Sequence, residues 1–255
     1  MFFTDSVFVG VDPTSGRKDF AYAALDDNLN LVALADADLD DMTAFLGGQQ
    51  SAVVAVNAPV QVNKGLVKKT LERGSLTHGH AFRGIDMRLV EYDLRARGIS
   101  VAGTPSREDI CPAWMQVGFE FYRKLSKMGF KPLGTDQTTH QWLETHPYAC
   151  FCVLLEQIPF PKPALEGRLQ RQLKLYDKGL RIADPMNFFE EITRFKLMRG
   201  ILPTDMLYSP DQLDVLVAAY TAWLVTNRPE EVTAVGDKDE GQMILPARGL
   251  REKYQ

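Results

Sequence analysis

Acidic residues stand at the ends of predicted structural elements, where a carboxylate can take part in chemistry. Asp12 ends the apolar run SVFVGVD at residues 6–12, and a Pro/Thr/Ser/Gly cluster then turns the chain. Because β-branched apolar runs favour buried strands, we expect this carboxylate at the exit edge of a sheet. Asp before Pro and Gly is also a common turn residue that bonds its own backbone. A catalytic role for Asp12 therefore depends on whether other acids converge on it.

Asp211 and Asp214 lie one helical turn apart at the start of the most regular predicted helix. This helix covers residues 211–227 and is opened by Ser209 and Pro210, a typical cap and first-turn pair. Asp211 can simply complement the helix dipole in the first turn. Asp214 adjoins the apolar face, where an unpaired carboxylate is costly. We therefore expect a cation or a hydrogen-bond donor beside Asp214.

Two more polar residues, Asn57 and Glu144, lie near predicted strand ends. The run SAVVAV at 51–56 is fully apolar, which is typical of a central parallel strand, and Asn57-Ala58-Pro59 follows it. Glu144 lies near the end of a predicted strand at 141–145, where an edge-strand acid exposed to water is the simpler alternative. Small polar groups thus collect at what we expect to be one sheet edge.

The remaining pattern indicates an α/β protein. Strands at 6–11, 19–25 and 30–36, joined by tight turns, predict an antiparallel meander. Hydrophobic spacing predicts helices at 39–46, 66–73, 84–97, 112–128, 148–155, 165–178, 185–198 and 211–227. The tail predicts a hairpin, 232–235 with 242–245, that has Asp237 and Glu240 as turn residues. No repeat or linker divides the chain, so we expect one domain over 1–255, with a lid or substrate insertion at 61–103 and a helical insertion at 159–205.

Composition narrows the possible partners and compartment. A net charge of -4 in 255 residues gives no global attraction to nucleic acid or anionic lipid. The three cysteines, Cys111, Cys150 and Cys152, lack zinc or disulfide-framework spacing, so we expect buried thiols in a reducing cytoplasm. His78 and His80 flank a glycine in a polar loop and are more simply solvated than metal-bound. We expect no signal peptide and no membrane span.

The order of elements is that of the ribonuclease H-like fold. Over nearly its whole length the sequence also resembles the domain-of-unknown-function 429 family of predicted ribonuclease H-like nucleases. The matching pieces are GVDPTSG (10–16), AVNAP (55–59), RGIDMRLVEYDLRARGI (83–99), LETHPYA (143–149), DQLDVLVAAYTA (211–222) and DEGQMILP (239–246). The resemblance implies a mixed five-stranded sheet with flanking helices and a helical insertion.

The resemblance also implies a site and a reaction. Its acidic cluster falls on Asp12, Glu144, Asp211 and Asp214. Carboxylates are hard ligands that suit Mg²⁺ or Mn²⁺, and two such ions can assist phosphodiester cleavage in DNA or RNA. Candidates for phosphate contacts are Arg17, Lys18, Arg83 and Arg88, although for each of them taken singly solvated surface charge is the simpler interpretation. A divalent-metal-dependent nuclease is therefore the expected activity.

Asn57 departs from the family pattern, which usually has Asp at the end of this strand. An amide oxygen can ligate a metal but brings no charge, so a second metal ion would bind more weakly if Asn57 is a ligand. A non-catalytic module that binds nucleic acid or protein is therefore an alternative. Another is an ATP-dependent phosphotransferase of actin-like fold, although no Walker A or G-x-G-x-x-G sequence is present.

Overall fold

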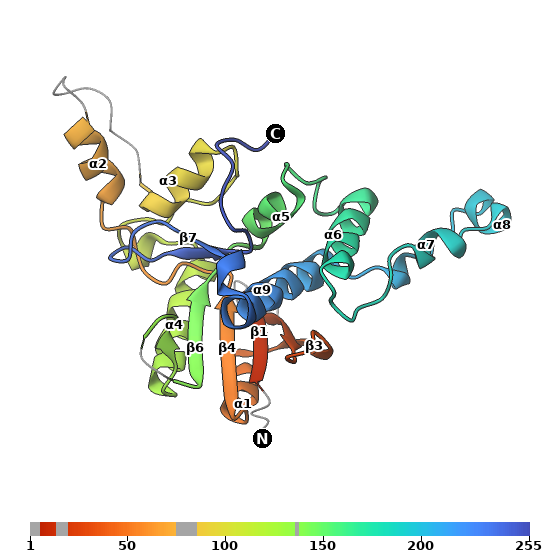
Figure 1. Cartoon of the computed structure of the whole chain (residues 1–255), viewed down its shortest axis with the longest axis horizontal. Coiled ribbons are helices and arrows are strands. Elements are labelled where there is room, and N and C mark those ends of the chain that lie inside the picture. The colour runs from red at the N-terminus through yellow and green to blue at the C-terminus, as the bar shows by residue number, and fades with distance from the viewer. Residues whose placement is uncertain (1–5, 14–19, 75–85, 136–137) are drawn as a thin grey trace.

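An open mixed β-sheet forms the centre of the protein (Figure 1). The computed structural model describes residues 6–13, 20–74, 86–135 and 138–255, with the backbone alone for 71–74. Within them the sheet has eight strands, ordered β3-β2-β1-β4-β6-β8-β7, with β5 paired to β6. The strands are β1 Ser6–Asp12, β2 Phe20–Leu25, β3 Leu31–Ala37, β4 Ser51–Val56, β5 Lys131–Pro132, β6 His140–Glu144, β7 Thr233–Val235 and β8 Met243–Leu245.

The predicted order of the central strands is confirmed, whereas the predicted number of strands is wrong. Strands β1, β2 and β3 form the antiparallel meander, and β1, β4 and β6 run parallel. The sheet has eight strands rather than five because β5 and the terminal hairpin of β7 and β8 extend it beyond β6. The link from β6 to β8 is a single pair, Glu144 with Met243, and β5 has two residues. The predicted hairpin is confirmed in β7 and β8, whereas its pairing with β6 was not predicted, and a strand of two residues such as β5 carries no readable alternation.

Helices cover both faces of the sheet (Figure 1). One apolar cluster joins the sheet to α1 and α4, and a larger one joins the opposite face to α9, α5, α3 and α6. The helices are α1 Leu39–Gly47, α2 Leu66–Gly74, α3 Leu89–Ala96, α4 Ala113–Lys127, α5 Pro147–Leu155, α6 Leu165–Asp177, α7 Asn187–Glu190, α8 Arg194–Met198 and α9 Pro210–Asn227. Short 3₁₀ turns lie at Glu108–Ile110, Thr204–Met206 and Pro229–Glu231.

Strand alternation decides which face each side chain joins. In β1, Phe8 belongs to the cluster on the α9 face, whereas Val9 and Val11 belong to the cluster on the α4 face. In β6, Leu143 faces α9 and its neighbour Trp142 packs on the α4 side. Because successive strand side chains point to opposite faces, two acids whose registers differ by one residue lie on different sides of the sheet.

Gly10 allows α9 to lie directly on β1. A Cβ atom at this position would lie 2.0 Å from the carbonyl oxygen of Val215 and 2.4 Å from the amide nitrogen of Ala219. Any side chain larger than hydrogen would thus push the helix off the strand. The close approach brings the first turns of α9 to the end of β1.

The helical insertion at 159–205 contains α6, α7 and α8, and α7 and α8 project away from the body (Figure 1). The predicted continuous helix at 185–198 is wrong, because the chain breaks between α7 and α8. Thr193 begins a new helix there, with its side chain accepting a hydrogen bond of 3.1 Å from the amide of Lys196. The segment 61–103 contains α2 and α3, and its part at 75–85 lies outside the described residues.

No membrane-crossing helix occurs among the described ranges: every helix there is too short or too polar.

Candidate functional site

Asp12 and Asn57 lie side by side at the carboxyl ends of β1 and β4. The register pairs Val11 with Val56, and the Asn57 amide nitrogen donates to the Val11 carbonyl at 2.9 Å. Beyond these pairs, Asn57 Nδ2 donates to Asp12 Oδ1 at 2.8 Å. The predicted convergence of the two strand ends is therefore confirmed. In this arrangement Asn57 holds the Asp12 carboxylate through its donor nitrogen.

The start of α9 adds Asp211 and Asp214 to this edge. Ser209 caps the helix: its hydroxyl accepts from the Gln212 amide at 3.2 Å, and the Gln212 side chain accepts from the Ser209 amide at 2.8 Å. Asp214 follows one turn into the helix and is buried, with 8% of its surface exposed. Its charge acts on Asp12, as does that of Asp211. The cap and the contact at Gly10 together place both acids near Asp12.

Lys162 is a functional candidate that sequence reasoning missed. Its Nζ lies 2.5 Å from Asp214 Oδ2 and 3.2 Å from Asp211 Oδ1. It belongs to the Pro-rich connector between α5 and α6, which has no periodicity and no recognisable motif. The partner expected for Asp214 is therefore a side-chain cation. Only the burial argument for Asp214 pointed toward it, and that argument did not say which residue it was.

Two carboxyl groups of this cluster, those of Asp12 and Asp214, have raised pKa values in spite of the positive charges near them. Burial, with a further contribution from Asp214, raises the pKa of Asp12 to about 7, although Asn57 and Lys162 oppose the rise. Burial also raises the pKa of Asp214, against the opposing charge of Lys162. A carboxylate that stays costly to ionise beside a lysine calls for a proton or another cation. Such perturbed groups are typical of functional sites.

His146 is a second candidate that the sequence did not reveal. It caps α5, with Nδ1 accepting from the Ala149 amide at 3.3 Å. Burial, with a smaller contribution from the nearby charge of Lys162, lowers its pKa to about 4. Near neutral pH the ring is therefore uncharged and carries its proton on Nε2. In the sequence, the only feature that could have indicated a functional role for His146 is its position shortly after the strand β6.

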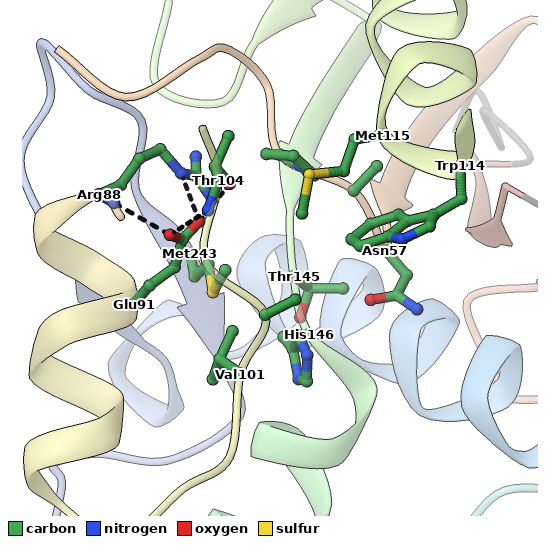
Figure 2. Close-up of a pocket in the computed structure, with 13 residues that line it drawn as sticks. Asn57, Arg88, Glu91, Val101, Thr104, Trp114, Met115, Thr145, His146 and Met243 are labelled. Atoms are coloured by element: carbon green, nitrogen blue, oxygen red, sulfur yellow. Dashed lines mark hydrogen bonds and ion pairs between the residues drawn. The ribbon is translucent and has the colours of Figure 1, made fainter. Parts of the chain in front are cut away.

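A small cavity of about 20 Å³ lies beside these residues. Figure 2 shows Asn57 at one end, Arg88 and Glu91 at the other, and Thr145 and His146 between them. A space of this size holds about one water molecule. It therefore does not accommodate a substrate in this structure.

Glu144 does not join the acidic cluster, contrary to the prediction. It pairs in register with Val56, one residue before Asn57, so its side chain lies on the α4 face. There it is 2% exposed, forms an ion pair with Arg88 and accepts from the Val60 amide at 2.9 Å. Across the described part of the chain, no group of three or more acidic, histidine or cysteine residues is arranged to hold a metal ion. The predicted four-acid cluster is thus not assembled.

Arg88 is a structural residue, which corrects its predicted contact with phosphate. Its side chain is fully buried, with Nε donating to Glu91 Oε1 at 2.8 Å and Nη1 to Glu144 Oε2 at 2.8 Å. These two carboxylates raise the pKa of Arg88 above its usual value, despite burial. Glu91 in turn accepts from the Thr104 amide at 2.7 Å. The guanidinium is therefore occupied by protein carboxylates.

Glu240 extends this buried network, although its position suggested a simple turn residue. It has no exposed surface. Its Oε1 accepts from the amides of Lys64 and Leu66 at 2.7 and 3.2 Å, and its Oε2 from the amide of Leu89 at 2.7 Å. One carboxylate thereby accepts hydrogen bonds from backbone amides at the starts of both α2 and α3, where such amides have no partner within the helix.

The remaining predicted residues divide into two groups. Cys111, Cys150 and Cys152 are buried and free, as expected. The other predicted phosphate contacts and the two loop histidines lie outside the described residues: Arg17, Lys18, Arg83, His78 and His80.

Comparison with known proteins gives one match. The model of a family described as Protein of unknown function (DUF429) matches residues 10–240, which is most of the chain. No curated protein and no solved structure matches the chain.

Proposed function

The chain belongs to the DUF429 family, and we propose that it is a divalent-metal-dependent nuclease of ribonuclease H-like fold that hydrolyses phosphodiester bonds in DNA or RNA. One observation carries this proposal: the half-buried Asp12 and the buried Asp214, both with raised pKa values, come together at the edge where the parallel strands β1 and β4 end. Ligands of open α/β sheets commonly bind at this edge.

The carboxylates at this edge are of the type that a hard divalent cation prefers, but the set is smaller than predicted, and in the described part of the chain no three such groups are arranged to hold an ion. Asp12, Asp211 and Asp214 offer carboxylate oxygens, the ligands preferred by Mg²⁺ and Mn²⁺. Glu144 is excluded because it lies on the other face. A bound ion would polarise the phosphodiester and lower the pKa of an attached water. The residues that would hold it are Asp12 and Asp214, with Asp211 beside them.

The chain's own residues have distinct tasks in this proposal. Asn57 orients Asp12 through its 2.8 Å hydrogen bond. His146, fixed by its helix cap, offers an Nε2–H that can donate to a phosphate oxygen without adding charge. Lys162 contributes a positive charge near the polyanionic substrate. Together they would position the phosphodiester beside the two aspartates.

We place this activity in the cytoplasm because all three cysteines are free and buried, which suits a reducing compartment. The predicted roles of Arg17, Lys18 and Arg83 in binding the nucleic-acid backbone remain part of the proposal.

The test is nicking of labelled DNA and RNA in Mn²⁺ or Mg²⁺ by the wild type and by Asp12→Asn and Asp214→Asn. We expect metal-dependent cleavage by the wild type and a loss of about 100-fold or more in both variants, since each mutation removes a charged ligand worth several kcal/mol. The matched control, Asp41→Asn, removes an exposed carboxylate from α1 and should cleave normally. Equal cleavage by all four proteins would contradict the proposal.

A non-catalytic binding module is the second candidate, and the orientation of Asn57 favours it. The amide that follows β4 donates to Asp12 and adds no negative charge to the site. On this alternative the wild type would bind labelled nucleic acid equally well with and without Mn²⁺ and would cleave none of it.

A further inference from the structure

The segment 184–206, which contains α7 and α8, exposes many large apolar side chains. We call this segment the arm, and it projects away from the body of the protein (Figure 1). Six large apolar side chains with 37% to 79% of their surface exposed lie between residues 189 and 202: Phe189, Phe195, Leu197, Met198, Ile201 and Leu202. Apolar groups gathered in this way on one segment are typical of an interaction surface.

The two helices of the arm have little packing of their own. α7 has four residues and α8 has five, and isolated helices of this length are marginal in water. α7 buries Phe188, whereas none of the five residues of α8, all of them described, is buried. α8 therefore lacks the packed apolar face that normally stabilises a helix, and a partner would supply it.

The charges of the arm favour a protein partner over nucleic acid. The arm has four acidic and three basic residues, which gives a net charge of -1: Asp184, Glu190, Glu191 and Asp205 against Arg194, Lys196 and Arg199. A segment of this charge has no electrostatic attraction to a polyanion.

These charges are also divided between the two helices. Glu190 and Glu191 lie at the end of α7, whereas the basic residues lie on α8 and directly after it. Glu191 pairs with Lys196 at 3.0 Å, but within the described residues Glu190 and Arg194 have no ion-pair partner. A second copy, related by a two-fold axis, would place the acidic end of α7 against the basic α8 in both directions.

The arm further carries both a projecting face and a hollow. Phe195 and Met198 are three residues apart and thus share one face of α8, with 62% and 79% of their surface exposed. A hollow of about 380 Å³ lies on the same arm, with Ile201, Leu202 and Met206 among its lining residues. Because a cavity of about 150 Å³ already holds benzene, this hollow has room for a phenylalanine ring. The two halves of a self-complementary contact are therefore present on one arm.

The exposed apolar surface is large enough for a dimer. A side chain of this size offers roughly 200 Å². The six side chains, each about half exposed, thus bring roughly 600 Å² per chain, or about 1,200 Å² in two chains, which is the size at which specific interfaces begin.

We propose that the chain forms a two-fold symmetric dimer through the arm. In this dimer α7 of each copy lies against α8 of the other, and Phe195 and Met198 of each copy enter the hollow of the other. Dimerisation through the arm is independent of the proposed nuclease activity.

The experiment is sedimentation velocity of the full chain over a range of concentrations. We expect a dimer at tens of micromolar. Met198→Glu places a charge in the apolar contact and should raise the dissociation constant about tenfold or more. Ile110→Glu is the matched control, because Ile110 is 54% exposed in a 3₁₀ turn outside the arm, and it should dimerise like the wild type. Thermal unfolding of each variant verifies that the compared chains are folded.

An exchange of charges tests how the two arms are oriented. Glu190→Arg and Arg194→Glu should each dissociate about tenfold more readily than the wild type, because like charges then face each other across the two-fold axis. An equal mixture of the two variants should dimerise like the wild type, since an acid meets a base again in both contacts. An effect within one chain would not be reversed by mixing.

A wild type that stays monomeric at hundreds of micromolar, or a dimer that Met198→Glu leaves intact, would overturn dimerisation through the arm. Growth beyond a dimer with rising concentration would overturn its two-fold symmetry. A mixture no more dimeric than its two components would overturn the placement of α7 against α8.

Discussion

Two groups of charges lie near the same sheet edge, and their strand acids, Glu144 and Asp12, point to opposite faces of the sheet. In the first group, Arg88 and Glu91 at the start of α3 meet Glu144, and the carboxylate oxygens also accept hydrogen bonds from backbone amides. On the α9 face, Asp12 and Asp214 share one lysine and keep raised pKa values. The first group is held by an arginine and backbone amides, whereas in the second the pKa values of Asp12 and Asp214 stay raised although Lys162 and Arg171 oppose the rise.

The difference explains why acids of the same type have different roles. A buried carboxylate with a bidentate arginine and amide donors is stable when ionised, and it holds its neighbours in place. A buried carboxylate beside another acid is costly until it takes up a cation or a proton. We therefore interpret the Glu144 group as structural and the Asp12 group as functional. The following mutations test that division.

Removal of the arginine from the Arg88, Glu91 and Glu144 group should have the largest effect on stability. Arg88→Met leaves Glu91 and Glu144 buried without their cation, so we expect the free energy of unfolding to fall by about 3–5 kcal/mol. Urea denaturation measures this change. Arg123→Met, which removes an exposed pair with Glu108, should cost at most about 1 kcal/mol. A similar small cost for both variants would refute the structural interpretation.

The group around Asp12 should instead make the free energy of unfolding depend on pH. Because the pKa of Asp12 is about 7 in the folded chain and 3.8 otherwise, the folded state holds a proton that the unfolded state releases. This contribution is fully present below pH 4 and is lost as the pH rises through 7, by a few kcal/mol.

The difference in unfolding free energy between wild type and Asp12→Asn isolates this effect. His146, whose lowered pKa acts in the opposite direction between about pH 4 and 6.5, is present in both proteins and cancels. We expect the wild type to lose stability relative to the variant from pH 4 to 7, and Mn²⁺ at pH 8 to restore part of it. A difference that does not change with pH would contradict the assigned environment of Asp12.

The contact between β1 and α9 should be the next most sensitive feature. Gly10→Ala places a Cβ against the backbone of Val215 and Ala219, so we expect a loss of about 1–3 kcal/mol in unfolding free energy. Mn²⁺ affinity should fall as well, because the acids of α9 are displaced from Asp12. Calorimetry on Gly65→Ala is the control, since no atom lies within 4 Å of a Cβ there, although its positive φ adds some strain. Unchanged Mn²⁺ affinity in Gly10→Ala would contradict this arrangement.

Adding a charge to the functional group should have the smallest effect. Asn57→Asp replaces the donor to Asp12 with a carboxylate, which would be the fourth of the group and the second at the strand ends. We expect Mn²⁺ to bind about tenfold more tightly, and the metal-free protein to lose about 1 kcal/mol of stability at pH 8 through repulsion. Titration calorimetry measures the first quantity and urea denaturation the second. Weaker Mn²⁺ binding by Asn57→Asp would instead indicate that the Asn57 amide is itself a ligand of the ion.

Local sequence patterns determined much of the fold and part of the candidate site. Apolar runs and turn residues predicted the strands that end at Asp12 and Asn57, and helical spacing with a Ser-Pro start predicted α9 and its two acids. These predictions succeed because each depends on a few neighbouring residues. The position of Asp214 beside the apolar face of the helix also predicted that its carboxylate has a cation or a hydrogen-bond donor as a partner.

Only the tertiary structure decided which acids meet. Glu144 was predicted near the end of a strand at 141–145, yet pairing with Val56 turns it to the α4 face, because a shift of one residue reverses a strand side chain. Lys162 lies in an aperiodic connector, and its position depends on contacts with a helix that follows it. Neither the sheet register nor the packing of that connector can be read from local spacing. The sequence alone therefore located the acids, while the register and the packing of α6 and α9 selected Asp12, Asp211, Asp214 and Lys162 as one group.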